Sequence, residues 1–132
     1  MRRTAFAKPY VWWVKDPLDL DAMRAAASAL TGFGDFRAFT DADPDEQSTR
    51  VLVDDVTVAR DGALLLVRVV GSHFLWKMVR RLVGTLVEAG RGNLDLPAVH
   101  ALLDEKSRRP AEWTAPPSGL FLESVKYRSK RR

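Results

Sequence analysis

The sequence contains no cysteine, which excludes a disulfide framework, a thiolate metal site and a cysteine nucleophile. Its two histidines, His73 and His100, lie far apart and have no partner at the spacing of zinc ligands. No apolar run approaches the ~20 residues of a membrane-spanning helix, and residues 1–10 lack the apolar stretch of a secretory signal. We therefore expect a cytoplasmic protein.

Motifs for several common catalytic chemistries are also missing. The sequence has no Ser-His-Asp constellation, no glycine-rich phosphate loop and no dinucleotide fingerprint. The acidic stretch 41–46, DADPDE, lacks the glycine and the distal glutamate of an EF-hand loop. Asp61, which precedes Gly62 between two alternating segments, indicates a hairpin turn rather than a catalytic aspartate. The residues alone therefore identify no reaction.

What the sequence does contain is a globular composition with an uneven charge. The 132 residues are 46% hydrophobic and 29% charged, which predicts one domain over residues 1–132. Residues 1–66 carry eight Lys/Arg against eleven Asp/Glu, whereas residues 67–132 carry thirteen against six. Residues 126–132 form a basic tail, which is either a solvated terminus or part of an anion-binding surface. The basic half indicates an anionic partner, with nucleic acid as the first candidate.

Hydrophobic periodicity predicts an α+β fold in the order β-α-β-β-α-α-β. Alternating or β-branched segments predict strands at residues 10–14, 49–59, 63–70 and 119–127. Apolar positions at helical spacing predict helices from the cap Asp19 to about residue 30, over residues 73–89 after the cap Ser72, and from about residue 95. Residues 32–48 and 106–118 are expected to be long loops. The predicted sheet is antiparallel or mixed, with the helices packed on one face.

The predicted helix over residues 73–89 places a row of basic side chains on one side. Four basic residues and one glycine share that side: His73, Lys77, Arg80, Arg81 and Gly84. A guanidinium on such a rigid element suits bidentate binding of a carboxylate or phosphate, and the small residue Gly84 leaves room beside Arg80. The alternative is a solvated helix face that makes ordinary ion pairs, for example with Glu88.

Further basic and aromatic residues are candidates for contact with RNA. Arg91, Arg108 and Arg109 lie near helix ends in predicted loops, where they either contact phosphates or remain solvated. Trp76 and Trp113 either stack on bases or pack at the edge of the core, and packing is the favoured interpretation. The residues therefore predict a basic-faced domain that binds nucleic acid.

Four segments together resemble the tRNA pseudouridine synthase A (TruA) family. Residues 73–92, HFLWKMVRRLVGTLVEAGRG, are similar to the family's FL-x-x-MVR-x-(I/L)-VG-x-L motif, and residues 115–127, APPSGLFLESVKY, to its AP-x-x-GLYL-x-x-V-x-Y motif. Residues 32–39, GFGDFRAF, resemble its G-x-HDF-x-(A/S)F motif. Residues 18–32, LDLDAMRAAASALTG, resemble its LD-x-x-xM-x-x-AA motif. The four motifs occur in the family's order and cover about residues 10–127.

The resemblance implies an enzyme that isomerises uridine to pseudouridine in the anticodon stem-loop of tRNA, without a cofactor or metal. In that family an aspartate attacks the nucleoside, an arginine pairs with the aspartate, a tyrosine stacks on the uracil and a leucine packs beside it. The arginine corresponds to Arg80 and the leucine to Leu120. The RNA-binding surface is expected to include His73, Lys77, Arg81, Arg91, Arg108 and Arg109. Members of the family are homodimers, which implies the same for the full-length protein.

Two of the family's motifs have no counterpart in this sequence. The aspartate lies in GRTD-x-GVHA and the stacking tyrosine in an RRYRY-like motif, both in the family's N-terminal half. Tyr10 corresponds to a later, structural tyrosine, while Gly34 replaces the family's histidine and Phe121 the tyrosine of GLYL. We therefore expect a C-terminal domain that is catalytically inactive until an N-terminal catalytic half joins it. Such a domain is also expected to expose apolar surface that its partner would cover.

Two other functions remain open at this point. A non-catalytic RNA-binding module would use the same basic surface without any chemistry. A structural protein whose basic half binds another anionic partner would do so without regard to the shape of tRNA.

Overall fold

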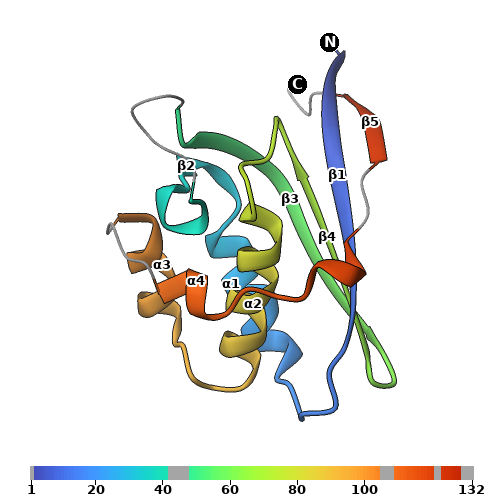
Figure 1. The fold of residues 1–132 in the computed structure, drawn as a ribbon, viewed down its shortest axis with the longest axis vertical. Coiled ribbons are helices and arrows are strands. Elements are labelled where there is room, and N and C mark those ends of the chain that lie inside the picture. Colours follow the sequence, from blue (N-terminus) through green and yellow to red (C-terminus); the bar gives the residue numbers. More distant parts are fainter. Residues whose placement is uncertain (1, 42–47, 105–108, 121–122, 129–132) are drawn as a thin grey trace.

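The computed structural model describes residues 2–41, 48–104, 109–120 and 123–128. The strands are β1 (Arg2–Trp13), β2 (Gly32–Asp35), β3 (Arg50–Asp61), β4 (Leu64–Gly71) and β5 (Glu123–Arg128). The helices are α1 (Leu20–Ala29), α2 (Met78–Gly90), α3 (Leu96–Asp104) and the single turn α4 (Arg109–Glu112). The strands form an antiparallel sheet in the order β2-β3-β4-β1-β5, and the helices gather on one side of it (Figure 1). This arrangement confirms the predicted α+β fold with helices on one face.

The two faces of the sheet differ because side chains alternate along each strand. In β1, Tyr10 is buried in the core and Trp12 packs against it, whereas Trp13 is 65% exposed. Trp13 lies opposite Leu64 of β4, and both Leu64 and Leu66 are exposed large hydrophobic residues. The face turned away from the helices therefore carries an exposed apolar strip in the described part of the chain.

Helix α2 lies in the core and packs against α1, which in turn lies against β3 of the sheet. Eleven of its thirteen residues are buried, including Leu82, Val83 and Leu86. Helix α1 packs against it through its buried face and begins at Asp19, whose carboxylate accepts a hydrogen bond from the Ala22 amide at 3.1 Å. Both the apolar stripe of α2 and the cap of α1 were predicted from spacing.

The hairpin between β3 and β4 also agrees with the prediction. Asp61 ends β3, Gly62 takes a φ of +58°, and β4 begins at Leu64. A glycine at this position is favoured because the turn needs a left-handed residue. The described residues contain no helix that is long and apolar enough to cross a membrane.

Helix α2 begins five residues later than predicted, at Met78 instead of His73. Residues 73–77 form a loop that ends at Lys77, which takes a left-handed φ of +63° and cannot continue a helix backwards. Ser72 does not cap the helix, because its hydroxyl accepts a hydrogen bond from the Leu52 amide in β3. The helical spacing misled the prediction because Leu75 is buried in the core from this loop rather than from a helix.

The two predicted loops are partly ordered into regular elements. Residues 32–35 form β2, which pairs with the start of β3, and a 3₁₀ turn follows at Arg37–Phe39. Residues 109–112 form α4, and a second 3₁₀ turn lies at Pro117–Gly119. Strand β1 also extends eight residues further toward the N-terminus than predicted and pairs there with β5. Strand β2 and the extension of β1 were not predicted because they form through pairing with distant segments, β2 with β3 and the start of β1 with β5.

Candidate active site

A pocket of about 320 Å³ opens where the start of α2 meets β1 and the chain around the second 3₁₀ turn. Its lining residues come from three stretches of sequence: Lys8, Phe74, Leu75, Trp76, Lys77, Met78, Val79, Arg80, Pro117 and Leu120. The pocket brings together Arg80 and Leu120, the two residues that the family resemblance singles out. They are forty positions apart in the sequence.

The segment before Leu120 is held against α2 by paired contacts with Arg80. The Ala115 amide donates to the Arg80 carbonyl at 3.0 Å, and the Arg80 Nε donates to the Ala115 carbonyl at 2.8 Å. Gly84, one turn further along the helix, allows the segment to lie this close, because a Cβ there would be 1.4 Å from the Trp113 carbonyl oxygen. Figure 1 shows the segment running from α4 past α2 toward β1.

Tyr10 fixes the far end of the same segment. Its side chain is buried, its hydroxyl donates to the Pro116 carbonyl, and its backbone forms a bridge with Leu120. Burial raises the pKa of the Tyr10 hydroxyl above its ordinary value, and the positive charge of Arg80 acts in the opposite direction. Tyr10 therefore holds Leu120 and the neighbouring segment to which Arg80 is bonded, which agrees with the expectation of a structural tyrosine.

Arg80 presents the unused part of its guanidinium to the pocket. Its Nε is bonded to Ala115, which orients the planar group. In the described part of the chain, its two terminal nitrogens have no hydrogen-bond or ion-pair partner. A guanidinium held in this way is prepared for an acceptor from outside the domain, and a carboxylate would match its fork.

Arg81, the next residue, has the opposite surroundings. Its side chain is only 5% exposed, and its terminal nitrogen lies 2.8 Å from the Asp41 carboxylate. Lys77 approaches the same carboxylate at 3.7 Å. The predicted basic ridge is therefore wrong: His73 and Lys77 precede the helix, and Arg81 turns inward to Asp41. This geometry does not support contact between Arg81 and RNA.

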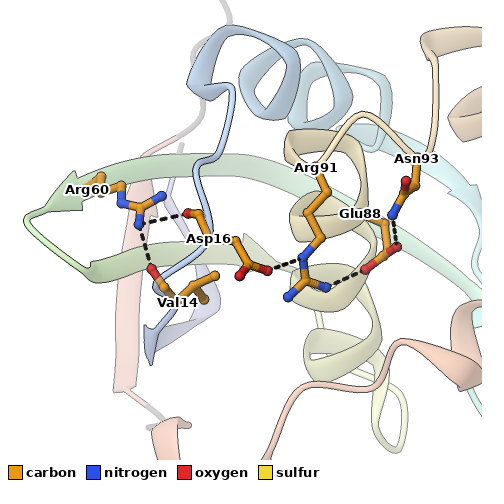
Figure 2. Close-up of polar contacts among 6 residues, drawn as sticks. All are labelled: Val14, Asp16, Arg60, Glu88, Arg91 and Asn93. Carbon is orange, nitrogen blue, oxygen red and sulfur yellow. Dashed lines mark hydrogen bonds and ion pairs between the residues drawn. The ribbon is translucent and has the colours of Figure 1, made fainter.

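Arg91, at the other end of α2, lies in a network of ion pairs (Figure 2). Its guanidinium donates to Asp16 at 2.8 Å and to Glu88 at 2.7 Å. These contacts raise the pKa of Arg91 further, the bond to Glu88 contributing most. Asn93 donates to the same Glu88 at 2.9 Å. The network joins the loop after β1 to the end of α2. Two nitrogens of the Arg91 guanidinium therefore already have carboxylate partners within the domain.

The remaining predicted residues are not brought together at the pocket. His73 is exposed, and its ring lies 3.1 Å from the Ser72 hydroxyl. Arg109 packs over the Trp113 ring at 5.1 Å, so Trp113 serves packing as favoured. Arg108, Phe121 and the end of the basic tail lie outside the described residues. Asp35 accepts hydrogen bonds from Thr49 and from the Arg37 amide, and it thereby supports the first 3₁₀ turn.

Two residues of the pocket, Lys8 and Phe74, were not predicted as part of a site from sequence, whereas Trp76 was a candidate for stacking on bases. Lys8 of β1 extends into the pocket, with its Nζ 5.2 Å from the centroid of the Phe74 ring. Burial lowers the pKa of the Lys8 ammonium. Trp76 is 61% exposed at the edge of the same pocket. The alternation of β1, which places Lys8 on the face of Tyr10, was the available signal. Among the described residues, no three His, Cys, Asp or Glu side chains are placed to hold a metal ion.

Comparison with known proteins extends over nearly the whole sequence. The profile of the tRNA pseudouridine synthase family matches residues 26–128. The tRNA pseudouridine synthase A of Pelobacter propionicus is 40% identical over 125 residues, which cover 95% of this chain and 51% of that protein. The enzyme of Geobacter sulfurreducens is 44% identical over 126 residues, which cover 96% and 52%. The enzyme of Methylobacterium nodulans is 42% identical over 123 residues, which cover 93% and 48%.

The chain thus spans about half the length of the curated relatives it matches. The matched region begins within α1 and continues through β5, and it includes the pocket residues Arg80 and Leu120. This chain belongs to the tRNA pseudouridine synthase family.

Proposed function

We propose that this chain is the C-terminal part of a tRNA pseudouridine synthase and supplies one wall of its active site. The observation that carries the proposal is the state of Arg80, which lines the pocket and is fixed by Ala115, yet keeps two terminal nitrogens without a partner among the described residues. Leu120 lines the same pocket and offers an apolar surface for a uracil ring. The substrate is a uridine in the anticodon stem-loop of tRNA.

The proposed chemistry needs a nucleophilic aspartate, and no segment of this sequence matches the family motif that carries that aspartate. An aspartate of an N-terminal catalytic half would enter the pocket and pair with the Arg80 guanidinium. The guanidinium keeps a carboxylate ionised in a partly buried site, because an opposite charge within ~4–6 Å lowers a carboxyl pKa by about 1–3 units. The ionised aspartate attacks the nucleoside and the glycosidic bond breaks. The detached uracil then turns, its carbon bonds to the sugar as the aspartate is released, and the hydrogen on that carbon is lost as a proton.

Arg80 and Leu120 thus have separate tasks in the proposed site. Arg80 holds the aspartate in its nucleophilic state, and Leu120 packs against the uracil while it turns. Because Ala115 and Tyr10 hold both residues in place, the site is organised before the second half arrives. The full-length enzyme is proposed to be a homodimer, as in the family.

The experiment is the release of tritium from tRNA labelled at the uracil carbon that forms the new bond. We expect no release by this chain alone and release when a separately produced catalytic half is added. Arg80→Ala in the assembled enzyme should lower turnover by several orders of magnitude without unfolding the domain. Near-normal turnover of the Arg80→Ala variant would show that catalysis does not require Arg80.

The other outcomes separate the alternative functions. Release by this chain alone would mean that it contains the nucleophile, with Asp35 and Asp61 the first residues to replace. Binding of tRNA without release, even with the catalytic half present, would support a non-catalytic RNA-binding module.

A further inference from the structure

The mouth of the pocket contains an exposed aromatic side chain that packing does not explain. Trp76 is 61% exposed and lies between the buried Leu75 and the left-handed Lys77. The loop is tied to α2, because the Met78 amide donates to the Leu75 carbonyl at 3.0 Å. The Lys77 Nζ lies 4.6 Å from the centroid of the Trp76 ring and covers one face of it. The indole is therefore held in place while most of its surface remains available.

The opposite wall of the pocket provides a cation. Lys8 extends from β1, packs its ammonium over Phe74, and has no carboxylate partner in the part of the chain that the structure describes. With Lys77 and Arg80, three cationic residues line the pocket, and none of its ten lining residues in the described part of the chain is acidic. A partly buried ammonium without a counter-ion favours binding of an anion, since the anion restores the lost solvation.

We propose that Trp76 and Lys8 bind a nucleotide next to the target uridine, Trp76 by stacking on its base and Lys8 by contact with its phosphate. The inference rests on the proposed tRNA substrate and adds two substrate-contacting residues to the pocket. An aromatic platform beside basic groups is the usual arrangement for single-stranded RNA, whose bases are free to stack. Nucleotides adjacent to an extruded uridine in a loop have that property.

The chain offers a matched control on the other face of the sheet. Trp13 is 65% exposed, and the Lys15 ammonium lies 5.8 Å from its ring centroid. Trp13 and Trp76 are similarly exposed and each lies near a lysine ammonium, but Trp13 and Lys15 are not among the residues that line the Arg80 pocket. A general contribution of surface tryptophan or lysine to RNA binding would appear equally at both places.

The first test measures binding of a fluorescently labelled anticodon stem-loop hairpin to the 132-residue chain at low salt. Trp76→Ala should weaken binding about ten-fold or more, because base–aromatic stacking contributes ~1–3 kcal/mol per base. Trp76→Phe should retain most of the affinity, and Trp13→Ala should leave it unchanged. Heparin, a polyanion without bases, should bind wild type and Trp76→Ala equally.

The second test follows the hairpin affinity as a function of salt. Lys8→Met keeps the aliphatic bulk and removes one charge, so the slope of log affinity against log salt should become shallower by about 0.7 for one lost phosphate contact on a single strand. Trp76→Ala should leave the slope unchanged, because it removes no charge. Lys15→Met should also leave it unchanged and serves as the matched control.

Three results would overturn the inference. These are a wild-type chain that fails to bind the hairpin at low salt, equal losses for Trp76→Ala and Trp13→Ala, and an equal effect of Trp76→Ala on heparin and RNA. These readouts measure binding and do not require turnover. A failure of the proposed enzymatic function, seen as absence of tritium release, is therefore distinguishable from a failure of the nucleotide contact.

Discussion

The two ends of helix α2 each carry an arginine, and the two arginines have different surroundings. At the end that begins with Met78, Arg80 is bonded through Nε to a backbone carbonyl, and its terminal nitrogens remain unused within the described domain. At the end near Gly90, Arg91 is bonded to the carboxylates of Asp16 and Glu88. The two residues are of the same type and belong to the same helix. What distinguishes them is whether the described domain supplies carboxylate acceptors: Arg91 has them and is structural, whereas Arg80 has none and is available to another group.

The largest expected effect comes from exchanging each arginine for lysine in the assembled enzyme. Arg80→Lys keeps the charge but loses the planar fork and the bond to Ala115, so turnover should fall by about 100-fold or more. Arg91→Lys should change turnover by less than about two-fold, because Arg91 does not line the pocket. Tritium release measures both variants. Equal losses at the two ends would contradict the assignment of different roles.

Two glycines of α2, Gly84 in the middle of the helix and Gly90 at its last position, permit a second test, now through stability. Gly84→Ala would place a Cβ 1.4 Å from the Trp113 carbonyl oxygen, whereas the Cβ of Gly90→Ala would lie 2.7 Å from the Cγ of the Met23 side chain. Backbone cannot rotate away as a methionine side chain can. We expect Gly84→Ala to lower the free energy of unfolding by about 2–3 kcal/mol. At Gly90 the alanine gains about 1 kcal/mol of helix propensity, so its net change should stay below about 1 kcal/mol.

Urea denaturation of the 132-residue chain gives both free energies of unfolding. Gly84→Ala should also lower turnover of the assembled enzyme, because it separates Ala115 from Arg80. A Gly84→Ala variant as stable as wild type would show that the segment 113–116 does not lie against the helix as described. If Gly90→Ala lost activity and Gly84→Ala did not, the site would depend on the packing at Gly90 and not on the close approach at Gly84.

Arg81 sharpens the comparison further, because it lies beside Arg80 but is paired within the domain. Asp41→Ala leaves the Arg81 charge buried without this partner, and it should lower the free energy of unfolding by about 1–3 kcal/mol. Arg81→Met removes the buried charge together with an Nε that has no hydrogen-bond partner in the described structure, so its cost should be below about 1 kcal/mol. Chemical denaturation compares the two. An Arg81→Met variant that is less stable than Asp41→Ala would mean that the pair itself stabilises the fold.

The sequence predicted the features of this fold that depend on local patterning. The apolar stripe of α2, the cap at Asp19 and the turn at Gly62 follow from spacing and residue type within a few positions. Family resemblance, rather than spacing, connected Arg80 with Leu120, and the pocket places both in one wall. The roles of these two residues in catalysis stay predictions.

What the sequence did not reveal depends on contacts between distant segments. Arg81 looked like part of an exposed ridge because its partner Asp41 is forty positions away. The early start predicted for α2 followed from apolar spacing that continues through Leu75, and only the left-handed backbone of Lys77 ends it. Lys8 was overlooked because the predicted strand began at residue 10, so the alternation that places Lys8 on the face of Tyr10 was not applied to it.

The smallest effect is expected at Arg91, where the comparison can be tested without any loss of function. Arg91→Gln removes two partly exposed ion pairs, so the free energy of unfolding should fall by about 0.2–1 kcal/mol, and the difference should shrink at high salt. A double-mutant cycle with Asp16→Asn should recover part of that value as coupling. The salt slope of hairpin binding should not change, because the Arg91 guanidinium is already paired with carboxylates of its own domain. If the salt slope of Arg91→Gln were as shallow as that of Lys8→Met, Arg91 would leave its network to contact phosphate. Both ends of α2 would then bind RNA.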